Sequence, residues 1–263
     1  GALMLAPLNR RLARDLLAAA GIAEPDEPLI ELVLRVSAIA CALPWVRELA
    51  LDPVIVGRDR VEIPYPRANV DPKRKPALGY RHMAIHPYPF ELESTIALRD
   101  GTQLVMRPIR PEDAELERRF VNGLSEQTRY FRFFYRLHEL SPAMLARFTQ
   151  VDYDRELALL ALAPDKDAPG DSVMVGIARS IANLDSESAE FAVVTADEWQ
   201  GRGVASALMK ALIANAKTKG LQRLVGTVLR ANHNMVRFTQ ALGFTIRDDP
   251  EDPDQVVAEF DLR

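Results

Sequence analysis

The sequence predicts an α+β fold in which helices pack on a mixed sheet, preceded by a small α/β segment. Three features indicate this class. Residues 64–89 hold six of the eighteen prolines and separate a short N-terminal part from a longer one. Asp100-Gly101 lies between two alternating apolar stretches, which is typical of a hairpin. The patterns beyond it do not follow the regular βαβ order of a parallel sheet.

The N-terminal part, residues 1–63, is too short to bury a large core of its own. Its periodicity predicts helices at about 8–20 and 26–43 and strands at about 47–56 and 60–63. Asp26 is in place to cap the second helix. Residues 64–91 are expected to form an extended linker, because proline restricts itself and the preceding residue to non-helical conformations.

The longer part, residues 92–263, begins with the hairpin and supplies the sheet. After the hairpin, the patterns predict helices at 111–122, 125–135 and 141–149, strands at 156–163, 172–183 and 188–195, a helix at 202–219, a strand at 222–228, a helix at 232–242, and strands at 244–247 and 255–261. Gly220 is expected to end the long helix. In "YFRFFYR" (130–136) the aromatic residues Tyr130, Phe133 and Phe134 form a helical stripe, for which core packing is expected rather than nucleic-acid stacking.

Composition narrows the class of protein. The net charge is −4, so we expect no nucleic-acid partner. No apolar run approaches the ~18 residues of a membrane span, so we expect no membrane partner, and the low cysteine content favours a cytoplasmic location. Cys41 is the only cysteine, which excludes an internal disulfide. His82 and His86 have the spacing of helical metal ligands, but Pro87 and Pro89 disfavour a helix there, so no metal is expected.

The stretch "DEWQGRGVAS" (197–206) places Gly201 and Gly203 directly before the long helix. A helix N-terminus leaves about four N–H groups unpaired, and glycines before it let an anion approach them. Arg202 adds a charge-assisted donor. The third glycine of G-x-G-x-x-G and the Gly-Lys-Ser/Thr of a P-loop are both missing. These residues alone are compatible with a pyrophosphate site or with a tight strand-to-helix turn.

Two motifs resemble the Gcn5-related N-acetyltransferase (GNAT) superfamily. "QGRGVA" (200–205) is similar to its Q/R-x-x-G-x-G/A signature, and "ANHNMVRFTQALGF" (231–244) is similar to its second motif. The resemblance covers residues 92–263 and implies the GNAT fold, a mixed, mostly antiparallel sheet flanked by helices. It implies acetyl-CoA as co-substrate, with main-chain N–H groups of the strand before the turn holding the pantetheine arm. The implied binding residues are Val193, Val194, Thr195, Gln200, Gly201, Arg202, Gly203, Val204, Ala205, Ser206 and Asn232.

A narrower resemblance is to bacterial Pat-type protein lysine acetyltransferases, carried by "FVNGLSEQTRYFRFF" (120–134) and "DYDRELALLAL" (152–162). It implies a protein substrate, such as an acyl-CoA synthetase or another metabolic enzyme. "APLNRRLARDLL" and "ELALDPVIV" resemble the end of the ATP-grasp region of the synthetase-like domain that precedes such enzymes. Ala50 and Asp52 replace the Asp and Asn of its E-x-D-x-N-P strand, so residues 1–63 are expected to be structural or regulatory.

The reaction requires a base, because a lysine amine has an unperturbed pKa of about 10.4 and is protonated near neutral pH. Glu190 resembles the general-base glutamate of lysine-acetylating members. Asp185, Glu187 and Asp197 are competitors, although Asp197 and Glu198 also suit the first turn or cap of the long helix.

Other residues bear on the mechanism. Thr239 occupies the position where many members have a tyrosine acid, which puts a dedicated acid in doubt. Cys41 lies outside the acetyltransferase part, so direct attack in a ternary complex is expected. Two alternatives are acetylation of a small amine and a non-catalytic acyl-CoA-sensing module. The target protein, the acyl length and the oligomeric state stay open.

Overall fold

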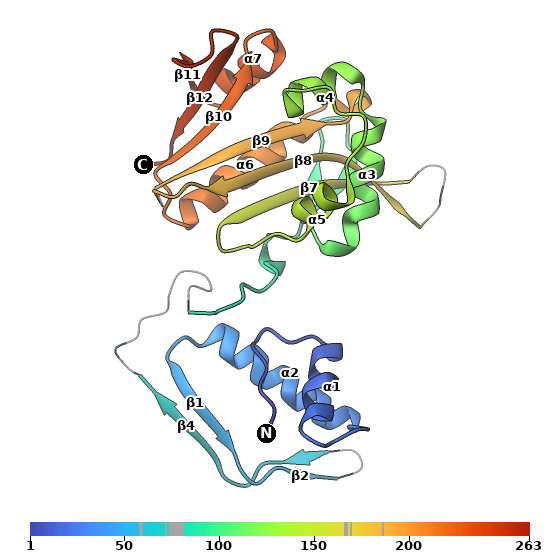
Figure 1. The fold of residues 1–263 in the computed structure, drawn as a ribbon, viewed down its shortest axis with the longest axis vertical. Helices are drawn as coiled ribbons and strands as arrows, with labels where there is room; N and C mark the ends of the chain where they lie inside the picture. The colour runs from blue at the N-terminus through green and yellow to red at the C-terminus, as the bar shows by residue number, and fades with distance from the viewer. Residues whose placement is uncertain (58–59, 72, 74–81, 166–167, 169, 186) are drawn as a thin grey trace. The chain divides into compact units, whose positions relative to one another are not determined.

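The computed structural model describes residues 1–57, 60–71, 73, 82–165, 168, 170–185 and 187–263 (Figure 1). The chain divides into two compact units, Gly1–Pro87 and Tyr88–Arg263. In the predicted linker (64–91), residues 72 and 74–81 lie outside the described residues. No helix in the described part of the chain is long and apolar enough to cross a membrane.

The first unit contains α1 (Arg10–Ala19), α2 (Glu27–Ala42), β1 (Val46–Leu51), β2 (Ile55–Val56), β3 (Val61–Glu62) and β4 (Pro66–Val70). Its core is small and includes Leu17 of α1 and Ile30 of α2. β1 pairs antiparallel with β4, and β2 with β3. β4 lies inside the stretch that we predicted to be linker. Proline is tolerated there because it starts a strand of a two-stranded sheet, where one edge needs no N–H partner.

The second unit carries an eight-stranded sheet in the order β11-β12-β10-β9-β8-β7-β6-β5. Its strands are β5 (Ser94–Ala97), β6 (Gln103–Pro108), β7 (Glu156–Pro164), β8 (Ser172–Ala182), β9 (Ser188–Thr195), β10 (Arg223–Leu229), β11 (Thr245–Asp248) and β12 (Gln255–Asp261). Its helices are α3 (Ala114–Gly123), α4 (Glu126–Phe133), α5 (Pro142–Thr149), α6 (Val204–Thr218) and α7 (His233–Ala241), with short 3-10 turns at Phe90–Leu92, Pro111–Asp113 and Asp197–Trp199. Among the strands of the described residues, only β9 and β10 are parallel neighbours, which confirms the mixed, mostly antiparallel α+β class.

Helices cover both faces of this sheet. Side chains alternate between the faces of a strand, so Leu159 of β7 packs in a cluster with Leu208 of α6, while Leu160 packs with Phe120 of α3. Figure 1 shows α6 on one face and α3 and α5 on the other. This two-sided burial fixes the position of β9 and of the turn that leads from it into α6.

Strands β9 and β10 pair only at their beginnings, from Ser188 with Arg223 to Glu190 with Val225, and then separate. Figure 1 shows β10 and β12 turning away from β9. At the separation, the Phe191 ring lies against Gly226, where a Cβ would be 2.5–2.9 Å from three ring atoms. One edge of β9 after Glu190 therefore has main-chain groups without a strand partner.

We expect Gly226→Ala to lower the free energy of unfolding by about 1–3 kcal/mol, because the new methyl group overlaps the packed Phe191 ring. Urea denaturation measures this. In a double-mutant cycle with Phe191→Leu, the double variant should lose less than the sum of the single losses. Additive losses would show that the Phe191 ring is not what Gly226 accommodates.

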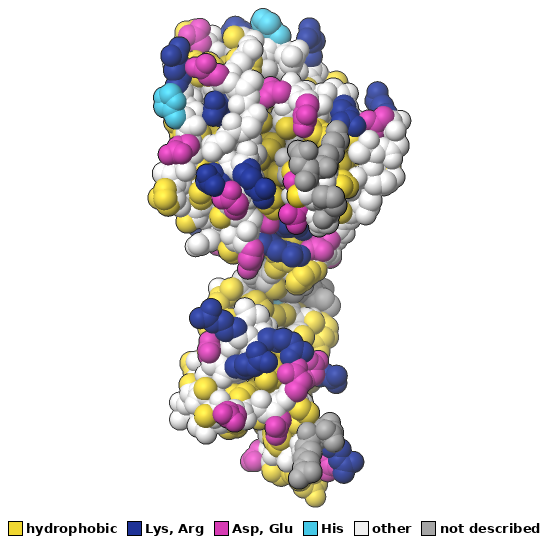
Figure 2. Space-filling view, turned by 90° about the vertical axis from the view of Figure 1, so that its right-hand side faces the viewer, with side chains coloured by type: hydrophobic (Ala, Val, Ile, Leu, Met, Phe, Trp, Pro, Cys, Tyr) yellow, Lys and Arg dark blue, Asp and Glu magenta, His cyan; other side chains and the backbone are white. Residues whose placement is uncertain are grey.

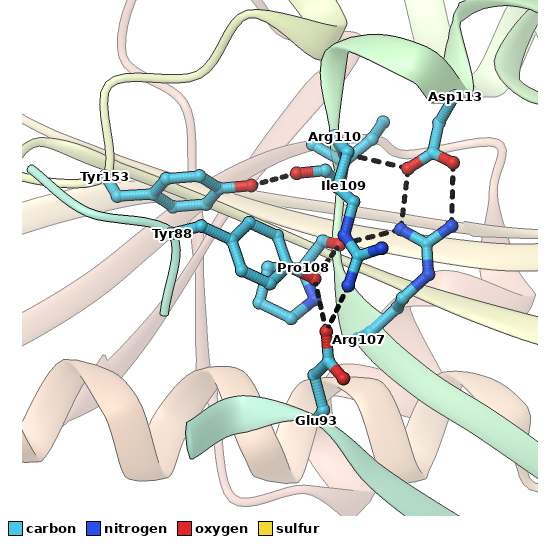
Figure 3. A network of polar contacts seen from close by, with 8 residues as sticks. All are labelled: Tyr88, Glu93, Arg107, Pro108, Ile109, Arg110, Asp113 and Tyr153. Carbon is cyan, nitrogen blue, oxygen red and sulfur yellow. Dashed lines mark hydrogen bonds and ion pairs between the residues drawn. The ribbon is translucent and has the colours of Figure 1, made fainter. Parts of the chain in front are cut away.

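A polar network holds the start of the second unit to the end of β6 (Figure 3). The Tyr88 hydroxyl lies 2.9 Å from a Glu93 carboxylate oxygen, and Arg110 lies over the Tyr88 ring at 4.7 Å and pairs with Glu93 at 2.6 Å. Beside it, Arg107 forms a two-pronged ion pair with Asp113 at 2.7 Å, nearly buried. The unit accordingly includes residues 88–91, which we had assigned to the linker.

Candidate active site

A cavity of about 870 Å³ opens where β9 and β10 separate. Its lining comes from β9, the turn into α6, α4 and the start of α7. This volume lies within the range of sites that bind small molecules and cofactors. Of the predicted binding residues, those that line it are Val193, Val194, Thr195, Gln200, Gly201, Gly203, Val204, Ala205, Ser206 and Asn232.

The turn before α6 is built for glycine. Gly201 and Gly203 have φ of 73° and 100°, in the left-handed region that disfavours other residues. A Cβ at either position would meet no protein atom within 4 Å, so the space beside them is open. Gly203 is the N-cap residue of α6, which has no side-chain cap and no acidic residue in its first turn. The first N–H groups of this helix are therefore available to an anion.

Two polar side chains in the lining have unused hydrogen-bonding capacity. The Thr195 hydroxyl is buried and has no partner. Asn232 is the N-cap of α7, where its side-chain oxygen accepts from Met235 N at 3.1 Å. Its amide NH₂ makes no hydrogen bond with a described residue. Both groups can serve a ligand in the cavity.

Arg202 was expected to donate hydrogen bonds to a bound anion, but its guanidinium is engaged elsewhere. It is not part of the cavity lining, because Asp100 holds its guanidinium at 2.6 Å and the Trp199 ring lies under it at 4.0 Å. Hydrogen bonds from Thr102, together with Arg202, keep the pKa of Asp100 far below its ordinary value. The cations that line the described cavity are Arg99, beside Asp100, and Arg132 of α4, and the sequence analysis missed both.

Asp197 also differs from the expectation, because it anchors α4 rather than capping α6. Its carboxylate accepts from the N–H and the hydroxyl of Ser125, both at 2.8 Å, and from the Thr128 hydroxyl at 2.6 Å. α4 consequently runs along the cavity, with Phe131, Arg132, Phe133 and Phe134 in the lining. Of the stripe assigned to the core, Phe133 does pack against the buried cluster around Phe120 and also lines the cavity. Phe134 is an exposed part of the cavity wall, and Tyr130 is exposed and outside the lining.

We expect Asp197→Ala to lower the free energy of unfolding by about 1 kcal/mol at pH 7, because three hydrogen bonds to an exposed carboxylate are lost. Burial raises the pKa of Asp197, but hydrogen bonds from Ser125 and Thr128 outweigh it and lower the value. The contribution is complete above the unfolded pKa of about 3.9 and is lost as the pH falls through the lower folded value. Melting curves of both proteins from pH 7 to pH 3 should converge at the acidic end; a constant difference would contradict the assignment.

Glu190 lies in the cavity lining, at the last residue of β9 that pairs with β10. Its two nearest competitors in sequence, Asp185 and Glu187, are not in the lining, and Asp185 instead accepts from the hydroxyl and N–H of Ser188 at the β8–β9 turn. Thr195 lies five residues farther along the strand, about 16 Å away at the rise of an extended chain. The carboxylate and the glycine turn therefore occupy opposite ends of the cavity.

Comparison with known proteins identifies the family. The family model of the acetyltransferase (GNAT) domain matches residues 103–245 of the sequence, which is more than half of the chain. The chain belongs to the GNAT acetyltransferase family. It is 38% identical to acetyltransferase PA5475 of Pseudomonas aeruginosa over 161 residues, 61% of this chain and 85% of that protein.

Two further relatives carry the name Pat. Acetyltransferase Pat of Mycolicibacterium smegmatis is 31% identical over 163 residues, which cover 59% of this chain and 45% of that protein. The crystal structure of the GNAT domain of S. lividans PAT matches with a TM-score of 0.60 and 31% identity, over 66% of this chain and 99% of that one. The chain thus spans less than half the length of the M. smegmatis relative.

As a GNAT acetyltransferase, the protein is an acetyl-CoA-dependent N-acetyltransferase, and its cavity fits this co-substrate. The uncapped N-terminus of α6 suits the pyrophosphate, and the unpaired edge of β9 suits the amide-bearing pantetheine arm. Thr195, whose buried hydroxyl has no partner, is the last residue of β9 before the turn into α6 and lines the same cavity. Among the described residues, no group of three or more His, Cys, Asp or Glu side chains could hold a metal ion.

Thr239 takes no part in the cavity of this GNAT domain. It is fully buried, and its hydroxyl donates to main-chain carbonyls of α7, those of Met235 and Val236, both at 3.0 Å. On the face drawn in Figure 2, basic and acidic side chains are interspersed on each unit rather than gathered by sign.

Proposed function

We propose that this GNAT acetyltransferase is a protein lysine N-acetyltransferase, acting on a protein such as an acyl-CoA synthetase or another metabolic enzyme. One observation carries this proposal. Glu190 lies in the wall shared by the large cavity and a second pocket of about 210 Å³. The second pocket is smaller than ordinary small-molecule sites, and its size suits a single inserted side chain. The relatives named Pat support the same substrate class.

Glu190 acts as the general base in this proposal. The carboxylate takes a proton from the lysine ammonium, directly or through a water, so that the nitrogen regains its lone pair. The nitrogen attacks the thioester carbonyl in a ternary complex, a C–N bond forms, the C–S bond breaks, and the nitrogen releases its second proton to solvent. The thiolate takes a proton from solvent, because Thr239 is buried and engaged and no tyrosine lines the described cavity. Cys41 belongs to α2 of the first unit, which favours direct attack over an acetyl-cysteine intermediate.

Incubation with acetyl-CoA, a panel of lysine-bearing proteins and a panel of small amines tests the substrate class. Thiol release with a 42 Da mass increase on lysine side chains is the expected result. Transfer to small amines alone would replace the proposal by small-amine acetylation. CoA binding without transfer to either panel would favour an acyl-CoA-sensing module.

We also propose that residues 1–63 are the C-terminal remnant of an ATP-grasp domain without nucleotide binding. The resemblance of its strands supports this, together with Ala50 at the position of an expected carboxylate ligand. A thermal shift with ATP and Mg²⁺ should show no stabilisation, and a clear rise in melting temperature would contradict the proposal.

A further inference from the structure

The pocket beside Glu190 has a charged lining. It shares Arg132, Glu190, Phe191 and Ala192 with the large cavity, and its remaining lining residues are Arg147, Phe148, Glu156, Arg179 and Ile181. The pocket thus meets the cavity at the carboxylate that is proposed to act as base. An acceptor amine that enters this pocket would meet Glu190 from the side away from the rest of the large cavity's lining.

Two of its three arginines are already paired. Arg147 forms a two-pronged ion pair with Glu156 at 2.6 and 2.7 Å. Arg179, which is 8% exposed, donates to the Phe148 carbonyl at 2.6 Å and to Glu117 at 3.1 Å. Neither of these two guanidinium groups is left to bind an acceptor.

Arg132 is different. Its guanidinium carbon lies 5.1 Å from the centre of the Phe133 ring, and the guanidinium forms no hydrogen bond or ion pair with a described residue, although the carboxylates of Glu117 and Glu190 are near enough to act on its charge. Burial and the neighbouring charge of Arg179 lower the pKa of Arg132 to about 10, against the opposite effect of the Glu117 and Glu190 carboxylates, so it remains a cation at neutral pH. A partly buried guanidinium whose N–H donors have no hydrogen-bond partner among the described residues favours an anionic ligand.

The position of Arg132 shows which ligand it can serve. Ser125, the N-cap of α4, is held by Asp197 beside the glycine turn, and seven residues of helix carry Arg132 about 10 Å away from that end. Arg132 shares the second pocket with Glu190, which is about 16 Å along β9 from Thr195. The phosphate groups of the donor bind at the opposite end, so the anion that Arg132 meets belongs to the acceptor.

We propose that Arg132 binds a carboxylate on the acceptor, that of an acidic residue directly next to the acetylated lysine. This inference rests on the proposed function. The lysine ammonium faces Glu190 and the neighbouring carboxylate faces Arg132, so the site matches a pair of opposite charges rather than a single one. Arg132 is thereby the residue that selects among lysines.

The test compares two peptides that have the same acceptor lysine and differ only in its neighbour, which is Asp in one and Asn in the other. The two peptides thus differ in a carboxylate against an amide. We expect wild-type kcat/KM to be about tenfold higher for the Asp peptide, the effect of one charge-assisted contact. Arg132→Gln should bring the ratio close to one, and Arg132→Lys should keep part of the preference. Arg147→Gln, in the same pocket but paired with Glu156, should keep the full ratio. A CoA thermal shift on each variant shows that the cavity is folded.

The remaining outcomes separate this inference from the proposed function. No preference in wild type, or a preference that survives in Arg132→Gln, would overturn the role of Arg132. If no peptide is acetylated, but 6-aminohexanoate is acetylated faster than its amide and this preference requires Arg132, then the proposal of a protein substrate would be refuted. The proposal that Arg132 binds an acceptor carboxylate would still hold. If CoA binds but no acetyl group is transferred to any of these amines, both the proposed function and the role of Arg132 would be refuted.

Discussion

Glu190→Gln is expected to lower kcat/KM for acetyl transfer by about 10²–10⁴-fold, the usual contribution of a positioned general base. The amide cannot accept the proton of the lysine ammonium at neutral pH, whereas its shape preserves the lining of the cavity and the second pocket. CoA affinity should change little, because the anion-binding turn lies about 16 Å away along β9. Initial rates of thiol release and a CoA titration measure the two quantities.

Glu187→Gln is the matched control for this experiment. Glu187 is a glutamate three residues away in the same β8–β9 segment, but it does not line the described cavity. We expect its variant to keep wild-type rates. Loss of activity in Glu187→Gln, or full activity in Glu190→Gln, would refute the assignment of the base. At higher pH, where a larger fraction of lysine is already neutral, the defect of Glu190→Gln should become smaller.

Much of the second unit was predictable from local sequence. Every predicted helix and strand between residues 94 and 261 is present, because turn residues such as Asp100-Gly101 and clear periodicities mark them. The anion-binding turn was also predictable, since Gly201 and Gly203 have a conformational requirement that shows in the sequence itself. These features depend on residues that are neighbours in the chain.

The missed features depend on contacts between distant residues. Asp197 contacts Ser125, 72 residues away, and this contact makes α4 a wall of the cavity. A hydrophobic stripe has the same pattern whether it faces a core or a cavity, so the periodicity of "YFRFFYR" could not reveal that role. Arg202 likewise pairs with Asp100, 102 residues away, which removes it from the lining. The sequence contained these residues but no local signal for their partners.

Gly203→Ala is expected to weaken CoA binding by about ten- to hundredfold, the effect of one or two lost hydrogen bonds to a charged group. Alanine disfavours the φ of 100° that Gly203 adopts, so the turn must relax or carry about 1–3 kcal/mol of strain. Relaxation would redirect the first N–H groups of α6, and the added methyl group would project into open space beside the cavity. Isothermal titration with CoA measures the loss.

Gly220→Ala separates the lost binding from general destabilisation. Gly220 follows the other end of the same helix and has a φ of 77°, and a Cβ there would also meet no atom within 4 Å. The strain in Gly220→Ala should therefore be similar to that in Gly203→Ala. Both variants should melt at lower temperature than wild type, but Gly220→Ala should bind CoA normally. Equal loss of CoA affinity in both would mean that helix stability, not the anion site at its N-terminus, controls binding. Normal affinity in Gly203→Ala would show that the pyrophosphate does not bind at this turn.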